Sequence, residues 1–585
     1  MRPGIGNTGS GGVNRRAVTL RIANWNVMMS FLRHRQIYLP MWTAAARRRR
    51  ARARSALELK RQNTRFCKGK NIRSVIHSLI TACMICGATA PAAASAPEVS
   101  VTGGKIRGSA AAYGGAVFKG IPFARPPVGD LRWRPALPPK PWHGVRDASA
   151  FAMPCVQGGP AGATGSEDCL YLNIWTPEPA PKSLHAVMVW FHGGGNFAGA
   201  ASDPVFDGES LARHGVLLVT AQYRLGVFGF FAHPDLTKQS RHHTSGNYGL
   251  LDQIACLRWV RDNIAHFGGD PQNITVFGES AGSLDVNVLM ASPLSDGLFQ
   301  RVIGQSGPVV APPPLADMEK RGLDLALKLT NQPGVKGLLA LSSAELLRAA
   351  GQGLSFLGPT LGVVVDGWLF PESPMRVFAE GKEHRVGLLL GTNARELQQP
   401  FFPMSGSLTQ AIVQQYGPLA ERALALYGLH GSSEPAPDPL FGTVLAQWAT
   451  DSQFRCGTVA ELLWHSGAGN PAYQFQFARV APGREAAGAS HGTEVPYVFG
   501  NLGAAANSPK YNDTDRQVSA AMQEYWTNFA KTGDPNGGRL PRWPQFTPAA
   551  RAYIEFTTGG PVVREGLRRQ VCDVYTENLK RQMMQ

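Results

Sequence analysis

Residues 275–283 read TVFGESAGS, in which an apolar run meets the pattern Gly-x-Ser-x-Gly. The run from Ile274 to Phe277 predicts a buried strand, and the pattern after it predicts a sharp strand-to-helix turn. The residue at the centre of such a turn, Ser280, is strained, and only very small residues fit two positions before and after it. The turn would lift the Ser280 hydroxyl above the sheet edge and place the amide of Ala281 at a helix N-terminus, where negative charge is favoured. Ser280 is therefore a candidate nucleophile.

A second glycine-rich segment lies earlier in the chain. Residues 186–191 read AVMVWF and predict a buried strand, which runs directly into HGGG at 192–195. Three successive glycines are poor for regular structure, but they suit a loop whose backbone amides point into a cavity. An ordinary flexible turn is the alternative interpretation. The nearby Gly-x-Ser-x-Gly turn favours a loop that binds an oxyanion.

The rest of the chain alternates between strand and helix patterns. Residues 247–266 have helical periodicity, 315–356 predict a helical insertion, and 406–468 are expected to be mainly helical. This alternation predicts an α/β fold with a large, mostly parallel central sheet flanked by helices and carrying helical insertions. No repeat or Ser/Gly linker divides 97–585, which favours one large domain. Further apolar runs predict strands at 170–175, 216–222, 301–306, 386–391 and 472–477.

A serine nucleophile needs a general base, and the base needs a carboxylate that orients it. In a fold of this kind the acid follows the nucleophile in the chain and the base follows the acid. Glu396 comes after an apolar strand, where sites of open α/β sheets lie. Three histidines follow it, namely His430, His465 and His491. His491 is favoured because it lies in a loop beside a glycine, whereas His465 reads as helical; His430, also in a loop, is the weaker alternative.

Charge is concentrated at the N-terminal end. The formal net charge is +17, but residues 1–73 contain 18 Lys and Arg and one acidic residue, Glu58, so the rest of the chain is neutral. The body of the protein therefore gives no electrostatic reason to expect nucleic acid as a partner. We expect residues 1–67 to be disordered or to lie outside the functional protein; a nucleic-acid-binding arm is the other interpretation.

Residues 68–96 have the pattern of a secretory signal peptide. A basic segment is followed by an apolar stretch at 74–90 and by small residues that predict cleavage after Ala94 or Ala96. The apolar stretch is too short and interrupted to predict a membrane span. The expected location is secreted or periplasmic. A lipoprotein signal, with Cys83 as the lipidated residue, is the alternative.

Five cysteines follow the predicted signal, and an odd number leaves at least one thiol free. Cys256 lies in a helical pattern and is the expected buried free cysteine. Pairing Cys155 with Cys169 would close a short loop, and pairing Cys456 with Cys572 a long one. Both pairs suit an oxidising compartment, although spacing alone proves neither. The sequence after the signal has no C-x-x-C or H-E-x-x-H pattern that suggests a metal. A serine nucleophile with a general base needs neither a metal nor another cofactor, so none is expected.

These motifs resemble those of the type-B carboxylesterases, the carboxylesterase/cholinesterase family of the α/β-hydrolase superfamily. The resemblance extends over about residues 98–577. The matching segments are GIPFARPPVG at 120–129, SEDCLYLN at 166–173, HGGG at 192–195, YRLG at 223–226, GLLDQ at 249–253, FGGDP at 267–271, FGESAG at 277–282, VDG at 365–367, GTNARE at 391–396, HGTE at 491–494 and GDPN at 533–536.

The resemblance implies a serine carboxylesterase that hydrolyses carboxylic esters through an acyl-serine intermediate, with a small ester and water as its only reactants. Because the base must be neutral, activity is expected to fall below about pH 6.5. The implied catalytic triad is Ser280, Glu396 and His491, and the implied oxyanion hole consists of the amides of Gly194, Gly195 and Ala281.

The resemblance also implies structural roles elsewhere. It supports both disulfides, since family members pair cysteines at corresponding places. Two structural ion pairs are implied, Arg132 with Glu167 and Arg224 with Asp252. Nothing in the sequence predicts an oligomeric state.

The sequence departs from the family pattern in two places. Asn196 follows the oxyanion glycines where an aromatic residue is usual, and Glu396 is flanked by Arg395 and Leu397 in place of Asp and Gly. Asp451 is the alternative acid. The segment between the first two paired cysteines is short and has no tryptophan, which disfavours choline esters. A lipase acting on water-insoluble esters, an amide hydrolase and a non-catalytic binding protein on the same fold are the alternative functions.

Overall fold

The computed structural model describes residues 96–584 except 160–161, 351–361, 402–403 and 432. They belong to one compact unit, Ala93–Gln585. The basic segment 1–67, residues 68–95 of the predicted signal peptide, Cys83 among them, and the end of the expected insertion at 351–356 lie outside the described residues.

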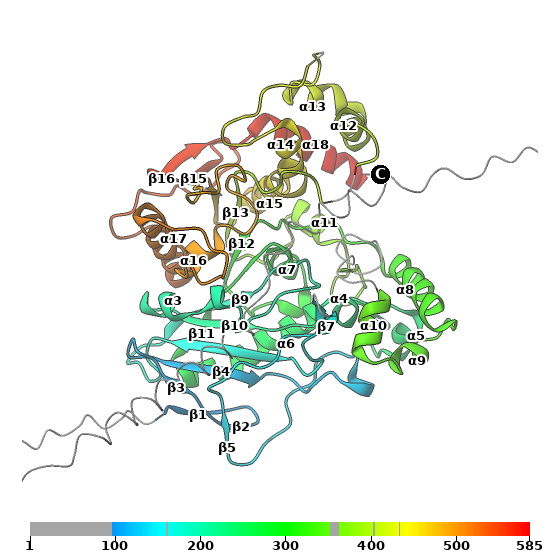
Figure 1. The fold of residues 1–585 in the computed structure, drawn as a ribbon, viewed down its shortest axis with the longest axis vertical. Coiled ribbons are helices and arrows are strands. Elements are labelled where there is room, and N and C mark those ends of the chain that lie inside the picture. The colour runs from blue at the N-terminus through cyan, green and yellow to red at the C-terminus, as the bar shows by residue number, and fades with distance from the viewer. Residues whose placement is uncertain (1–95, 160–161, 351–361, 402–403, 432, 585) are drawn as a thin grey trace, which may run out of the picture. The chain divides into compact units, whose positions relative to one another are not determined.

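An eleven-stranded sheet forms the centre of this unit (Figure 1). Its strand order is β16-β15-β14-β13-β12-β11-β9-β10-β8-β4-β3. The seven strands from β15 to β10 run parallel, and the strands at both edges are antiparallel. The parallel strands are β9 (His185–Phe191), β10 (Leu217–Ala221), β11 (Gly269–Glu279), β12 (Arg301–Gln305), β13 (Gly387–Asn393), β14 (Ala472–Phe477) and β15 (Ala552–Thr557). The antiparallel strands are β3 (Ser109–Ala110), β4 (Ala116–Pro122), β8 (Tyr171–Thr176) and β16 (Gly560–Glu565).

Both faces of the sheet are covered, and β9 shows why its sequence is apolar without a break. Val187 and Val189 point into one core, which includes Leu257 of α6 (Tyr248–Asn263). Met188 and Trp190, which alternate with these valines, point into a second core, which includes Met522 of α17 (Asp513–Thr532). Alternate side chains of a strand point to opposite faces, so a sheet buried on both sides requires apolar residues at every position. The predicted α/β fold is confirmed.

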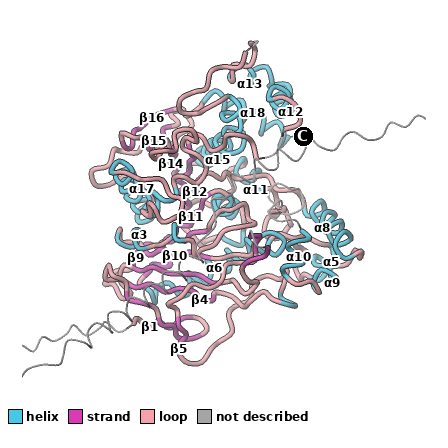
Figure 2. Tube along the Cα trace, in the orientation of Figure 1, coloured by secondary structure: helices cyan, strands magenta, loops and turns pink. Residues whose placement is uncertain are grey.

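The predicted elements agree with the observed ones to within a few residues. The helix expected at 247–266 is α6 followed by a short 3₁₀ turn, Ile264–Phe267. The insertion expected at 315–356 contains three described helices that lie together with helix α5 (Pro234–Gln239) (Figure 2). The remaining helices are α3 (Glu209–Arg213), α4 (Gly226–Gly229), α5 (Pro234–Gln239), α7 (Ala281–Leu289), α8 (Leu315–Thr330), α9 (Val335–Leu339), α10 (Ser343–Ala350), α11 (Pro374–Ala379), α12 (Leu408–Tyr416), α13 (Ala420–Leu426), α14 (Val444–Thr450), α15 (Cys456–Gly467), α16 (Val495–Phe499) and α18 (Arg569–Met584).

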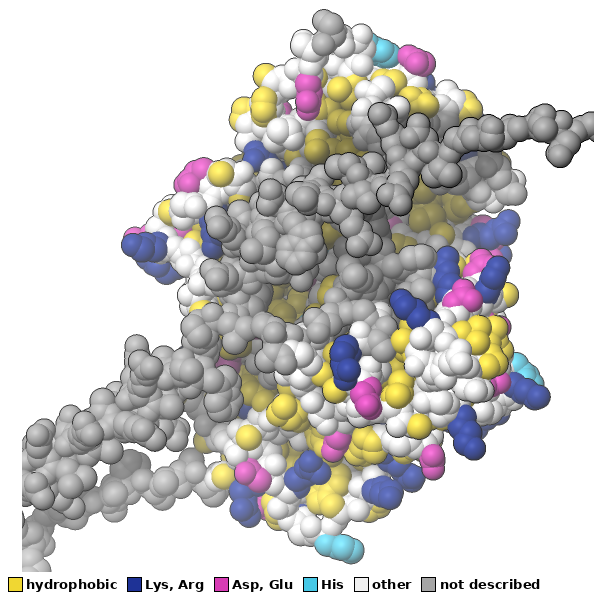
Figure 3. Space-filling model, turned by 45° about the vertical axis from the view of Figure 1, so that its right-hand side comes forward, with side chains coloured by type: hydrophobic (Ala, Val, Ile, Leu, Met, Phe, Trp, Pro, Cys, Tyr) yellow, Lys and Arg dark blue, Asp and Glu magenta, His cyan; other side chains and the backbone are white. Residues whose placement is uncertain are grey.

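Two small sheets stand apart from the central one. β1 (Glu98–Val101), β2 (Gly104–Arg107) and β5 (Val145–Asp147) form the first, and β6 (Gln157–Gly159) pairs with β7 (Gly162–Thr164) in the second. On the face that Figure 3 presents, basic and acidic side chains are interspersed among the described residues. In the described part of the chain, no helix combines the length and apolar character needed to cross a bilayer.

Candidate active site

Ser280 lies between the end of β11 and the start of α7, on the predicted sharp turn. Its backbone angles are φ 57° and ψ −122°, a conformation that a residue with a side chain rarely adopts. Such strain persists only where the surrounding structure enforces it, and it is concentrated at functional sites. The local backbone therefore has the geometry of a nucleophile elbow.

The two glycines of the pattern are required by close backbone contacts. A Cβ atom on Gly278 would lie 2.4 Å from the backbone of Gly282, on the far side of the turn. A Cβ on Gly282 would lie 2.1 Å from the carbonyl oxygen of Phe191, at the end of β9. The absence of a side chain at these two glycines therefore lets the start of α7 pack directly against the neighbouring strand.

Ser280, His491 and Glu396 form a continuous hydrogen-bonded chain. His491 Nε2 lies 2.8 Å from Ser280 Oγ, and His491 Nδ1 lies 2.7 Å from Glu396 Oε2. With the ring proton on Nδ1, the imidazole donates to the carboxylate and its Nε2 accepts the serine hydroxyl. This arrangement is that of a nucleophile, a general base and an orienting acid.

The carboxylate of Glu396 is itself fixed. Its Oε1 accepts hydrogen bonds from the Ser306 hydroxyl and from the Asn393 amide, both at 2.6 Å. The backbone amide of His491 donates to the carbonyl of Glu396 at 3.1 Å. Glu396 is only 2% exposed, so these donors replace the water that the carboxylate has lost.

The alternative histidines lie elsewhere. His465 is buried, with Nδ1 2.8 Å from Glu383 and Nε2 3.0 Å from the carbonyl of Val386. His430 is exposed, and its ring lies 3.8 Å from Glu421. Both rings are thus held by groups away from Ser280.

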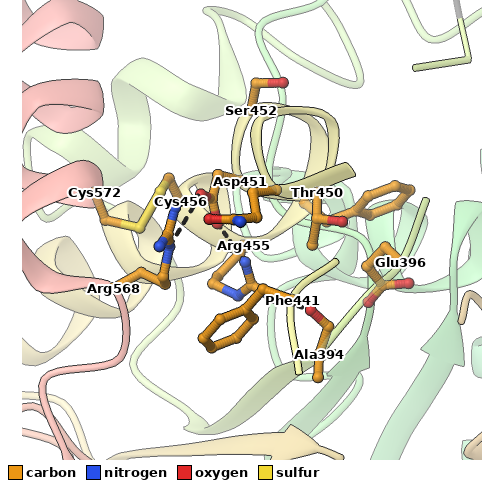
Figure 4. Close-up of polar contacts among 12 residues, drawn as sticks. Ala394, Glu396, Phe441, Thr450, Asp451, Ser452, Arg455, Cys456, Arg568 and Cys572 are labelled. Carbon is orange, nitrogen blue, oxygen red and sulfur yellow. Dashed lines mark hydrogen bonds and ion pairs between the residues drawn. A yellow bond between two sulfur atoms is a disulfide. The ribbon is translucent and has the colours of Figure 1, made fainter. Parts of the chain in front are cut away.

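The alternative acid, Asp451, belongs to a buried cluster of ionic side chains (Figure 4). It pairs with Arg455 one turn later and with Arg568 at 2.8 Å. Arg455 Nη2 donates to the carbonyl of Ala394 at 2.5 Å, two residues before Glu396. Asp451 thus lies behind the segment that carries the acid and contacts none of the proposed reacting groups.

The glycine loop after β9 presents backbone amides beside the elbow. Gly194 and Gly195 have φ values of 103° and 66°, which glycine adopts without strain. Neither of their amides donates a hydrogen bond to another described residue. The amide of Ala281 begins α7, where the helix dipole adds positive potential. Three amides therefore remain for an oxyanion near Ser280.

Two further carboxyl groups face this centre. Glu279 Oε1 lies 3.3 Å from His491 Nε2, and Glu494 is fully buried nearby. Burial raises the pKa of Glu279 to about 8 and raises that of Glu494 as well. Burial alone would lower the pKa of His491, but Glu279 and Glu396 outweigh it and raise that pKa to about 9. The charged form of the imidazole is therefore favoured by its surroundings.

The expected disulfides and ion pairs are present. Cys155 is bonded to Cys169 and Cys456 to Cys572, and Cys256 is buried and free. Both ion pairs are bidentate, with shortest distances of 2.6 Å for Arg132 with Glu167 and 2.7 Å for Arg224 with Asp252. The described residues contain no group of three or more His, Cys, Asp or Glu side chains arranged to hold a metal ion.

Sequence reasoning missed Ser306, Glu494 and Asp285 as parts of this region. Ser306 follows β12 in a Gln-Ser-Gly segment and has φ 55°, so a serine directly after a predicted strand was the available signal. Glu494 lies in the HGTE motif and accepts from Asn393 at 2.6 Å. Asp285 lies one helical turn after the elbow in α7, and only the packed structure reveals its partners.

Comparison with known proteins agrees with this geometry. The model of the Carboxylesterase family matches residues 95–575. A fumonisin B1 esterase from Sphingopyxis macrogoltabida is 37% identical, over 73% of this chain and 81% of its own. Carboxylesterase 3 from Homo sapiens is 35% identical, over 84% of this chain and 92% of its own. The crystal structure of the Geobacillus stearothermophilus carboxylesterase EST55 at pH 6.2 superposes with a TM-score of 0.70 at 34% identity, covering 82% of this chain and 99% of that one. The chain therefore belongs to the carboxylesterase family and is a carboxylic ester hydrolase of the α/β-hydrolase fold.

Proposed function

We propose that this esterase uses Ser280 as its nucleophile, His491 as its general base and Glu396 as the acid that orients the base. The observation that carries the proposal is the hydrogen-bonded chain from Ser280 Oγ through both ring nitrogens of His491 to Glu396. Ser280 Oγ attacks the ester carbonyl carbon while His491 Nε2 takes the hydroxyl proton. Glu396 holds the ring in the required tautomer and stabilises the imidazolium.

The tetrahedral intermediate carries its negative charge on the former carbonyl oxygen. We propose that the amides of Gly194, Gly195 and Ala281 donate hydrogen bonds to this oxygen. Removing one such donor typically costs about 2.7–4 kcal/mol of transition-state stabilisation. The intermediate collapses, the alcohol leaves with the proton from His491, and Ser280 stays acylated. Water then attacks the acyl-serine while His491 takes its proton, and the intermediate collapses as His491 returns that proton to Ser280 Oγ and the carboxylic acid leaves.

We propose that the substrate is a small carboxylic ester. The relatives differ in what their names say they act on: one is a fumonisin B1 esterase, and a relative from Anas platyrhynchos, 33% identical, is a medium-chain fatty acyl-CoA hydrolase. A panel of p-nitrophenyl esters with acyl chains of increasing length would define the acyl preference. Activation by emulsified triglyceride would favour the lipase alternative.

We also propose that the protein acts outside the cytoplasm. Two disulfides in a chain of this size support an oxidising compartment, and residues 68–96 have the composition of a secretory signal. Cell fractionation with N-terminal sequencing of the exported protein tests this; a start at Pro97 or at Ser95 is expected.

The direct test of the roles is the variant Ser280→Ala. Turnover of p-nitrophenyl acetate and butyrate is expected to fall by at least about 10³-fold, because no group remains to form the acyl-enzyme, while the thermal unfolding midpoint stays near that of the wild type. Retained turnover in a folded Ser280→Ala protein would refute the assignment.

A further inference from the structure

Asn196, the first residue after the glycines proposed for the oxyanion hole, has its side chain held by hydrogen bonds. Its side-chain Nδ2 donates to Asp285 Oδ1 at 2.8 Å, and its Oδ1 accepts from the Tyr223 hydroxyl at 3.0 Å. Its backbone carbonyl accepts from the Gly226 amide at 2.6 Å. Asn196, which stands where an aromatic residue is usual, therefore forms hydrogen bonds that an aromatic side chain would not form.

Asp285 is the centre of these contacts, and it is a costly group to bury. It lies in α7 and is completely buried. Its second oxygen accepts from Gln253 Nε2 of α6 at 2.5 Å. Asp285 forms no ion pair with another residue in the part of the chain that the structure describes, so side-chain amides alone compensate its burial. Burying a carboxyl group without a cation is destabilising, so the burial of Asp285 depends on the hydrogen bonds that Asn196 and Gln253 donate to it.

The contacts of Asn196 complete the attachment of the glycine loop. On the other side of the glycines, the carbonyl of His192 lies 2.7 Å from the same Tyr223 hydroxyl oxygen, so His192 and Asn196 share its single proton. The rings of His192 and Tyr223 stack with their centroids 4.7 Å apart. Between these anchors, Gly194 and Gly195 have no side chains to pack. The carbonyl of Gly194 accepts from the amides of Phe197 and Ala198 at 3.2 and 3.1 Å. The glycine amides are therefore held by the backbone turn that follows them and by the contacts of His192 and Asn196.

We propose that Asp285 is a positioning residue that acts through Asn196 to hold the amides of Gly194 and Gly195 where the oxyanion develops. This inference rests on the proposed function, because it concerns the same oxyanion hole. Asp285 belongs to the helix that begins at Ala281, so one rigid element supplies one oxyanion amide and fixes the loop that supplies the other two. Donors of this kind are effective only when fixed before the reaction, at 2.7–3.1 Å from the oxygen.

The contact with Asn196 does not require a particular charge on Asp285. Burial raises the pKa of Asp285 to about 7, so both forms occur near neutral pH. In either form Oδ1 can accept from Asn196. Oε1 of Gln253 has no hydrogen-bond partner among the described residues. If the side-chain amide of Gln253 is flipped, this oxygen can accept the proton of neutral Asp285. Asparagine at position 285 offers the same acceptor and donor, which makes Asp285→Asn the conservative variant.

The test compares kcat and KM for p-nitrophenyl butyrate among Asp285→Ala, Asn196→Ala, their double variant and Asp285→Asn. We expect each alanine variant to lower kcat about 10- to 100-fold with KM changed less than about threefold, since a loosened oxyanion hole affects the transition state and not the bound ester. The double variant should lose no more than either single one, because both remove the same link. Asp285→Asn should keep at least about half of the wild-type kcat.

A matched control separates positioning from general destabilisation. Asp366 is a buried carboxyl that is also held by amides alone among the described residues, namely the Asn247 side chain and the Trp368 and Phe370 backbones. Asp366→Ala should lower the unfolding midpoint and leave kcat within about twofold. Affinity for a trifluoromethyl ketone, which forms an oxyanion on Ser280, should fall in parallel with kcat in the Asp285 and Asn196 alanine variants.

Unchanged kcat in folded Asn196→Ala would overturn the inference, as would additive losses in the double variant or an equal loss of kcat in Asp366→Ala. These outcomes leave the proposed function intact if Ser280→Ala remains inactive. If Asp285→Ala does not fold, Asn196→Ala and Asp285→Asn still decide the question.

Discussion

At the scale of single residues, Glu279 lies 3.3 Å from Nε2 of His491, the proposed general base, and raises the pKa of its imidazole. The imidazole must be neutral to accept the proton of Ser280. Carboxylates near the ring favour its charged form, so its pKa lies above the usual value near 6.5. The acid limb of activity is therefore expected at higher pH than the sequence alone suggested.

The variant Glu279→Gln tests this electrostatic relation. It removes a group 3.3 Å from His491 Nε2 that stabilises the imidazolium. The pKa of His491 should fall, and the acid limb of kcat/KM should move to lower pH. A pH–rate profile with p-nitrophenyl acetate from pH 5 to 10 measures the shift. An acid limb that stays in place or moves upward would contradict the proposed coupling.

The three side chains that the structure joins in a hydrogen-bonded chain, and that we propose as the catalytic residues, could be selected from the sequence, whereas the groups that support them could not. Ser280 and Glu396 each come at the end of an apolar strand pattern, and His491 lies in a loop pattern. The order nucleophile, acid, base along the chain further limits which residues can fill these roles. The partners of Asp285 and the contact of Arg455 with Ala394 depend on how distant segments pack. No local pattern encodes such contacts, so only the folded structure reveals them.

At the scale of elements, the bidentate pair of Arg224 and Asp252 ties the segment after β10 to helix α6. Both side chains are nearly inaccessible, 3% and 0% exposed. Breaking such a pair leaves an uncompensated buried charge, which costs about 3–5 kcal/mol. The pair is thus part of the scaffold that carries the site.

We expect Asp252→Ala to lower the free energy of unfolding by about 3–5 kcal/mol, as measured by denaturant titration. Glu209→Ala is the control, because it removes an exposed partner of Arg213 on α3, and such pairs contribute about 0.3–0.5 kcal/mol. Equal effects of the two substitutions would refute the scaffold role of the buried pair.

The accuracy of the predicted elements follows from burial. Strands in the parallel part of the sheet are apolar throughout because helices cover both faces, so runs such as 186–191 are visible in the sequence. The hairpin of β15 and β16 was not predicted. β16 lies at the edge with mostly exposed residues and lacks such a run, and β15 is buried but its apolar run is interrupted by Glu555. The end of the helix at 247–266 was misjudged by a few residues, since its last turn is 3₁₀.

At the scale of the whole molecule, the two disulfides differ in what they restrain. Cys155–Cys169 spans 14 residues, whereas Cys456–Cys572 spans 116 and joins the starts of α15 and α18. Closing a longer loop removes more entropy from the unfolded chain. The second disulfide should therefore contribute more to stability.

Replacing both members of a pair by serine measures these contributions. The Cys456/Cys572 double variant should lose about 4–5 kcal/mol and the Cys155/Cys169 variant about 3 kcal/mol, according to the chain-entropy model. Thermal unfolding of the two variants beside the wild type gives the order. A larger loss for the shorter loop would contradict this explanation.

The fold brings Ser280 within hydrogen-bond distance of His491, and we propose that Ser280 is the residue that carries the acyl group. The most direct measurement is mass spectrometry of the enzyme after reaction with an organophosphate such as diethyl p-nitrophenyl phosphate, which mimics the acyl-transfer step. We predict one added diethylphosphoryl group per chain, on the peptide that contains Ser280, with loss of esterase activity in the same proportion and no labelling of Ser280→Ala. Stoichiometric labelling at another residue, or inactivation without modification of Ser280, would contradict the claim.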